Sequence, residues 1–83
     1  MKIKYYAGIH VPAGWRQVEY ISTVEKISPK MVKVIHVDLI DGEEPSKKQS
    51  RTGANRQKFN GEWWAAHEVG KNKRLSSCTI LEE

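Results

Sequence analysis

The chain has 83 residues, enough for one small domain, and a core of that size is only marginally stabilising unless something reinforces it. Its one cysteine, Cys78, excludes an internal disulfide and favours a reducing compartment. No apolar run reaches the ~18 residues of a membrane span, and the N-terminus lacks the continuous apolar stretch of a signal peptide. We therefore expect a cytoplasmic protein, and the net charge of +4 favours an anionic partner.

Two strands open the chain. Residues 2–10 alternate between two faces, a period-2 pattern typical of a half-buried strand. The apolar face holds Ile3, Tyr5, Ala7 and Ile9, and the opposite face holds Lys2, Lys4, Tyr6 and Gly8. Pro12 and Gly14 then end this strand. Residues 15–24 form the second strand, and its weaker alternation predicts a bulge or bend near Ser22 and Thr23.

Residues 31–40 form the most apolar segment. Three valines and two isoleucines favour a strand over a helix here. One face would hold Met31, Ile35, Val37 and Leu39, and the other Val32, Val34 and Ile40. A strand that is apolar on both faces is predicted to be central and covered on both sides.

A long polar segment follows, from 41 to 55. The turn pair Asp41-Gly42 begins it, and the remainder has almost no apolar residue. Such a stretch cannot offset the entropy lost on ordering, so a loop of this length is either functional or disordered. It is the clearest candidate for a binding element.

The residues around Asn60-Gly61 allow two structures. This pair is a strong type I′ turn signal, which predicts a hairpin with arms 56–59 and 62–69. The segment 61–69 also fits a short helix, capped by Asn60 and ended by Gly70. We prefer the strand, because the span is short for an isolated helix.

The chain then ends with a tight connection at 70–73 and a last strand over 74–81. Five or six short strands joined by turns predict a small closed or nearly closed β-barrel, either all-β or β-rich with a single short helix at 61–69. The layout is a meander with one long early loop and a final short hairpin, and it resembles that of SH3-like small barrels. This is a resemblance of pattern and names no function.

The sequence offers little for catalysis or metal binding. A Cys78–His67 pair would make a nucleophilic dyad, but no third, orienting group accompanies it, and Cys78 fits a core position on an apolar strand. No histidines or cysteines lie at metal-ligand spacing, and no phosphate-binding loop is present. We therefore expect no catalytic activity, metal or cofactor. The full set of possible catalytic side chains is His10, His36, His67, Cys78, Asp38 and Asp41.

The distribution of cations and tryptophans gives a clearer indication of function than the candidate catalytic residues do. Eight cations and two anions lie between positions 47 and 74, namely Lys47, Lys48, Arg51, Arg56, Lys58, Lys71, Lys73 and Arg74 against Glu62 and Glu68. In a strand over 62–69, Trp63 would face inward and Trp64 outward, where its indole can stack on an unpaired base. The alternatives are that Trp64 is a second core residue and that the cations form a solvated face.

These residues predict a non-catalytic accessory protein that binds nucleic acid, in particular RNA or another single strand, since no recognition helix is evident. The eight cations would contact phosphates while Trp64 stacks. The alternative is a protein-binding module, as in some phage or mobile-element proteins, that docks on or inhibits a larger protein with an acidic surface. A second aromatic patch of Trp15, Tyr5, Tyr6 and Tyr20 keeps this alternative open. The oligomeric state is unknown from the sequence, and an edge strand could pair with a second copy of the chain.

Overall fold

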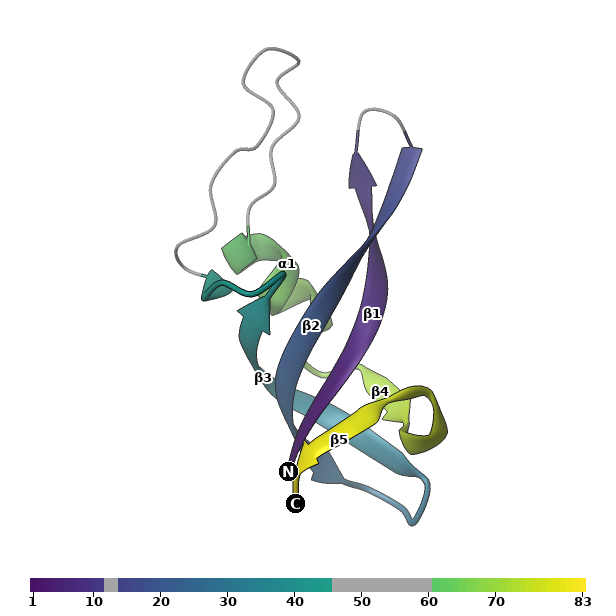
Figure 1. The fold of residues 1–83 in the computed structure, drawn as a ribbon. Helices are drawn as coiled ribbons and strands as arrows, with labels where there is room; N and C mark the ends of the chain where they lie inside the picture. Colours follow the sequence, from purple (N-terminus) through teal and green to yellow (C-terminus); the bar gives the residue numbers. More distant parts are fainter. Residues whose placement is uncertain (12–13, 46–60) are drawn as a thin grey trace.

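The computed structural model describes residues 1–11, 14–45 and 61–83, and this part of the chain forms a five-stranded antiparallel sheet with one short α-helix (Figure 1). Helix α1 (Gly61–Glu68) comes between β3 and β4 in the chain, and a 3-10 helix, η3 (Leu75–Ser77), comes between β4 and β5. The order across the sheet is β4-β3-β2-β1-β5. The strands are β1 (Lys2–Val11), β2 (Gly14–Lys26), β3 (Met31–Ile40), β4 (Asn72–Arg74) and β5 (Thr79–Glu82).

The hairpin of β1 and β2 confirms the predicted alternation. The two strands pair from Lys2 with Thr23 to Val11 with Gly14 without a register shift. Ile3, Tyr5 and Ile9 are buried on one face, while Tyr6 on the opposite face is 65% exposed. Tyr5 and Tyr20 face each other across the pair, and their rings stack with centroids 5.4 Å apart. The face with Tyr5 is hereafter the inner face of the sheet, and the face with Tyr6 the outer face.

β3 is a strand, but its predicted faces are wrong. Its pairing with β2 shifts between Ile21 and Ser22 and again between Thr23 and Val24, which confirms the expected irregularity near these residues. Each shift leaves one β3 residue, Asp38 or Ile35, opposite no partner, as in a β-bulge. Two bulges within five residues change the period, so four residues spaced by two and three face the core: Val32, Val34, Val37 and Ile40. Ile35 is 47% exposed, so β3 is not covered on both faces.

Residues 61–68 form a helix, so the preferred hairpin arm over 62–69 is wrong and the alternative is confirmed. The segment has no β-branched residue, its two alanines are strong helix formers, and Glu62 lies in the first turn, where a negative charge is favourable. The helix ends at Glu68, and the turn that follows includes Gly70, whose φ of +93° suits glycine. Asn60 and the other predicted arm, 56–59, lie outside the described residues.

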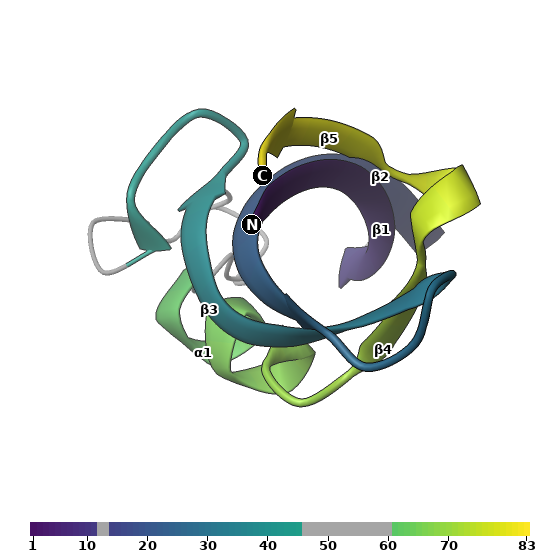
Figure 2. The same cartoon turned by 90° about the horizontal axis from the view of Figure 1, so that it is seen from below.

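The predicted last strand over 74–81 is wrong as a single strand: it begins at the last residue of β4, continues through η3 and ends in β5, and the predicted connection over 70–73 already contains most of β4. β4 pairs with β3, whereas β5 pairs with β1, so the two strands lie at opposite edges of the sheet. η3 joins them, and the Leu75 amide donates to the Lys30 carbonyl while the Cys78 amide donates to the Leu75 carbonyl. Figure 2 shows that the sheet curls strongly, with β4 and β5 on the same side of the curl. The two edge strands are not paired with each other, so the sheet is open.

The core lies on the inner face of this curled sheet. Helix α1 and η3 add partly buried side chains to it, from Trp64, Ala65 and Leu75. No helix in the described part of the chain has the length and apolar character needed to cross a membrane. The buried hydrophobic residues are Ile3, Tyr5, Ile9, Val18, Tyr20, Val24, Val32, Val34, Val37 and Ile40.

Candidate nucleic-acid interface

The predicted cations fall into two groups. Three of them, Lys71, Lys73 and Arg74, belong to β4 and the turn before it. The other five lie outside the described residues, as does most of the predicted loop over 41–55; they are Lys47, Lys48, Arg51, Arg56 and Lys58.

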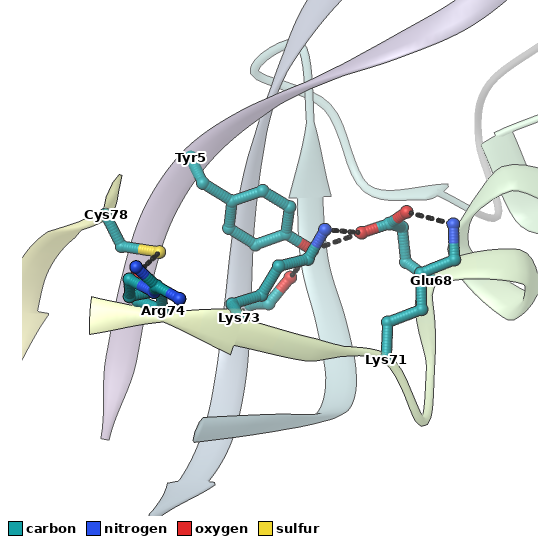
Figure 3. A network of polar contacts seen from close by, with 7 residues as sticks. Tyr5, Glu68, Lys71, Lys73, Arg74 and Cys78 are labelled. Carbon is teal, nitrogen blue, oxygen red and sulfur yellow. Dashed lines mark hydrogen bonds and ion pairs between the residues drawn. The ribbon is translucent and has the colours of Figure 1, made fainter. Parts of the chain in front are cut away.

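Two of these three cations, Lys71 and Lys73, bind a buried carboxylate. Glu68, at the end of α1, is 3% exposed, and Lys73 Nζ lies 2.9 Å from its Oε1 while Lys71 Nζ lies 3.1 Å from its Oε2. Tyr5 donates its hydroxyl proton to the same Oε1 at 3.0 Å. Figure 3 shows these groups converging on Glu68 from β1, β4 and the turn before β4. The contacts tie α1 to the sheet.

The charged groups around Glu68 stabilise its ionised form. Burial by itself raises the pKa of the Glu68 carboxyl, but hydrogen bonds from Lys73 and Lys71 and the charge of Lys73 outweigh it, and the pKa lies below its ordinary value. Burial raises the pKa of Tyr5 far above that of a free phenol, so Tyr5 remains a donor. Since its proton goes to Glu68, the 3.1 Å contact with Ser22 must have Ser22 as the donor. Lys73 also lies 4.5 Å from the centre of the Tyr5 ring.

Lys71, Lys73 and Arg74 therefore differ in how accessible their charges are to a binding partner. Lys73, whose side chain is 21% exposed, is held by Glu68 and Tyr5. Lys71 is 44% exposed at its side chain and can reach solvent while it contacts Glu68. Arg74 is exposed at the end of β4. Lys71 and Arg74 thus remain available for phosphates, whereas Lys73 mainly holds the fold together.

The two adjacent tryptophans have exchanged their expected roles. On the helix Trp64 is half-buried and packs against the core, while Trp63 is 55% exposed. The Trp63 ring stacks on His67, one turn later, with centroids 5.3 Å apart and planes 5° from parallel. Trp64 meets Trp63 edge to face at 4.6 Å. The assignment of Trp63 inward and Trp64 outward was wrong because it assumed a strand.

The second aromatic patch is also rearranged. Tyr5 and Tyr20 belong to the core and cannot join an exposed patch. Tyr6 and Trp15 are 65% and 74% exposed, and both lie on the outer face of the β1–β2 hairpin. The period-2 alternation of β1 already separated Tyr6 from Tyr5, and this was the signal that could have resolved the patch.

Three of the candidate catalytic side chains, Cys78, His36 and Asp38, lie in structural contacts, and the side chain of His10 lies outside the described part. The Cys78 thiol donates to the Arg74 carbonyl at 3.4 Å, and burial raises its pKa, with the charge of Lys73 opposing this in part. A raised pKa is the opposite of what activates a nucleophilic thiol. His36 Nδ1 lies 3.1 Å from Asp38 Oδ1, and Thr23 donates to the other oxygen of Asp38 at 2.8 Å. Among the described residues, no three acidic, histidine or cysteine side chains are grouped as metal ligands.

The positive charge of the protein is concentrated in one stretch of sequence. Residues 46–60 contain five cations and no anion, a net charge of +5. The other 68 residues contain nine Lys and Arg and ten Asp and Glu, a net charge of −1. The basic character of the chain therefore belongs to the segment that leads directly into α1 and Trp63.

No family model matches the chain, and no curated protein or solved structure has significant similarity to it, so its function has to be inferred from its own residues.

Proposed function

We propose that this protein is a non-catalytic accessory protein that binds single-stranded nucleic acid, RNA in particular. One observation carries the proposal: the basic segment 46–60, which holds more than the whole net charge of the chain, is followed within three residues by the exposed Trp63. Cations that track a phosphate backbone, together with an aromatic face for the bases, are the combination used by proteins that bind single strands without reading their sequence.

In this proposal each group has a physical task. The cations of residues 46–60, with Lys71 and Arg74, neutralise phosphates and supply most of the affinity. A base stacks on the exposed ring of Trp63, which is already aligned with His67, so the base extends an existing stack. Trp64 supports Trp63 from the side and keeps α1 on the core.

A single strand is favoured over a duplex by the side chains that helix α1 carries. Helix α1 is only eight residues long and carries two adjacent tryptophans. It has no row of polar side chains that could hydrogen-bond to base edges in the major groove of a duplex. Unpaired bases, in contrast, present flat faces that an exposed indole can stack on. The reducing cytoplasm suits this function, since the single thiol stays reduced there.

We further propose that the open sheet is a variant of an SH3-like small barrel. The supporting features are the order β4-β3-β2-β1-β5, the strong curl, and the short η3 that links the two edge strands. This fold hosts many functions, so it does not itself support nucleic-acid binding.

The alternative is docking on, or inhibition of, a larger protein with an acidic surface. The exposed Tyr6 and Trp15 favour it, because tyrosine and tryptophan are frequent anchors of protein interfaces. Salt distinguishes the two functions. Binding through several phosphates weakens steeply as salt rises, whereas an interface anchored by aromatic residues changes much less.

The test is fluorescence anisotropy with labelled 12-nucleotide RNA, the same DNA sequence and the corresponding duplex, at low and at physiological salt. We expect salt-sensitive binding that is tightest for the single strands. Trp63→Ala should weaken it by ~1–3 kcal/mol, while Trp63→Phe, which keeps a stacking face, should weaken it much less. No binding to any of the three at low salt would overturn the proposal.

A further inference from the structure

A pocket lies at one end of the sheet, between η3 and the turn that joins β2 to β3, two segments that lie side by side (Figure 2). Its volume of about 610 Å³ is within the range of small-molecule sites. We call it the η3 pocket. Its apolar floor includes half-buried side chains, and its rim carries two exposed cations and an exposed hydroxyl. The lining residues are Pro29, Lys30, Met31, Arg74, Leu75 and Ser76.

Backbone hydrogen bonds hold both walls of this pocket. The Leu75 amide of η3 donates to the Lys30 carbonyl of the turn at 2.9 Å, and Met31 lies opposite Arg74 in the pairing of β3 with β4. Within the turn, the Met31 amide donates to the Ser28 hydroxyl oxygen at 3.1 Å. A ligand that enters a pocket whose walls are already in place does not have to offset the entropy of ordering them.

The two rim cations have no anionic partner in the part of the chain that the structure describes. No acidic side chain is among the described residues that line the pocket, and neither Lys30 nor Arg74 is in an ion pair there. Lys71 and Lys73, in contrast, are held by Glu68. The charges of Lys30 and Arg74 are therefore open to an anionic ligand.

Charge selects the η3 pocket over the groove between β3 and α1. That groove has a volume of about 650 Å³, and its described lining has three carboxylates, Asp38, Glu44 and Glu62, against one lysine, Lys2. Clefts concentrate the field of the charges that line them, so a phosphate would be repelled from the groove. Of these two cavities, the η3 pocket is the one that suits a phosphate.

We propose that the η3 pocket binds one nucleotide of the bound single strand, with its phosphate on Lys30 and Arg74 and its base against Met31 and Leu75. The inference rests on the proposed function and deepens it. Lysine and arginine donate charge-assisted hydrogen bonds to phosphate oxygens, and the flexible thioether of Met31 packs well against flat rings. Neither apolar side chain can hydrogen-bond to a base edge, so this contact adds affinity and not sequence preference.

One strand can contact both this pocket and Trp63. The chain runs from Trp63 to the end of α1 at Glu68 and then through the turn to Arg74. This path is roughly 28 Å at most, at about 1.5 Å per helical and about 3.4 Å per extended residue. A 12-nucleotide strand spans ~40 Å even at the ~3.4 Å per nucleotide of a stacked strand. The RNA chosen for the binding test is therefore long enough for both contacts.

The first test uses the two methionines as reporters. Met31 lines the pocket, whereas Met1 packs against the core and does not line it. In a protein with isotope-labelled methionine methyl groups, adenosine monophosphate titrated into the millimolar range should shift the NMR signal of Met31 and not that of Met1. Adenosine should bind at least about fivefold more weakly, because it lacks the phosphate. If inorganic phosphate shifted the Met31 signal as strongly as the nucleotide does, the pocket would hold an anion without a base, and the proposal would be wrong.

The second test changes the rim and the floor separately. Lys30→Gln should lower the slope of log K for the 12-nucleotide RNA against log salt by about 0.7, the value for one phosphate contact. Its matched control, Lys26→Gln, has the same net charge at an exposed position outside the pocket and should leave the slope unchanged. Met31→Gln should weaken binding about threefold, and Met31→Leu, which stays apolar, should weaken it less. Circular dichroism verifies that each variant is folded.

The outcomes separate this inference from the proposed function. If the RNA binds and Trp63→Ala weakens it, but Lys30→Gln and Met31→Gln bind like the unmodified protein, the pocket contact is wrong while the proposed function stands. If adenosine monophosphate shifts the Met31 signal but no single strand binds at low salt, the pocket takes a free nucleotide and the proposed function is wrong. If neither ligand binds, both conclusions are wrong.

Discussion

At the scale of single residues, the buried carboxylate of Glu68 holds the end of α1 against the sheet. It accepts a hydrogen bond from Tyr5 and pairs with Lys71 and Lys73. Removing one partner of a buried ion pair leaves the other charge uncompensated, which costs ~3–5 kcal/mol. Glu68→Gln keeps the volume and an acceptor for Tyr5, so we expect a loss of about 3 kcal/mol in the free energy of unfolding, measured by urea denaturation.

The matched control for that prediction is Glu62→Gln. It makes the same chemical change on the same helix at an exposed position, where substitutions usually stay within about 0.5 kcal/mol. If Glu68→Gln were as mild as Glu62→Gln, the network of Figure 3 would not stabilise the fold.

The same carboxylate makes stability depend on acid. The pKa of Glu68 is lower in the folded protein than its ordinary value of 4.5. Folding therefore favours the ionised form: this stabilisation is complete above that value and is lost as pH falls through the folded pKa. We expect the free energy of unfolding to decrease below pH 4.5, and to decrease less steeply in Glu68→Gln, when urea denaturation is repeated across this range. Equal slopes for the two proteins would contradict the assignment.

At the scale of elements, the end of α1 depends on one backbone conformation. Gly70 has a φ of +93°, and an added β-carbon would meet nothing within 4 Å, so only the conformation resists substitution. A left-handed residue other than glycine costs roughly 1–2 kcal/mol. Gly70→Ala should therefore lower the free energy of unfolding by about 1 kcal/mol, and Gly70→Asn by less, because asparagine tolerates positive φ. An equal loss in both variants would point to a cause other than the backbone.

The elements also show which kinds of information the sequence holds. The alternation in β1 predicted its faces correctly because its pairing with β2 has no bulge. In β3, Ile35 is a common strand residue and Asp38 an uncommon one, but neither residue by itself fixes where the register shifts. The helix was predicted only as the alternative, because Trp63 and Trp64 fit a strand as well as a helix, and the contact of Glu68 with Tyr5 that helps to hold the helix involves a residue far away in sequence. The exposure of Trp63 and the partial burial of Trp64 follow from the helix.

At the scale of the whole molecule, the described sheet and helix are close to neutral and residues 46–60 are strongly basic. Residues 1–45 and 61–83 together have a net charge of −1; this count includes residues 12 and 13, which are uncharged. Residues 46–60 have a net charge of +5. If binding depended on net charge alone, the position of a neutralised cation would not matter. If the basic segment supplies most of the contact, cations in that segment should matter more than cations elsewhere, because exposed charges beyond about 10 Å are largely screened at 0.1 M salt.

Two triple variants with the same net charge separate these cases. One changes Lys47, Lys48 and Arg51 to glutamine, and the other changes the exposed Lys26, Lys30 and Lys33; both reduce the net charge from +4 to +1. We expect the first to reduce the slope of log K for RNA against log salt by about 2, at about 0.7 per phosphate contact. The second should reduce the slope less, since those lysines lie outside residues 46–60; Lys33 pairs with Asn72 and Lys30 lies beside Arg74, so they adjoin β4 rather than the basic segment. Equal losses in the two variants would mean that attraction to RNA is a property of the overall charge, and residues 46–60 would then have no special part in binding.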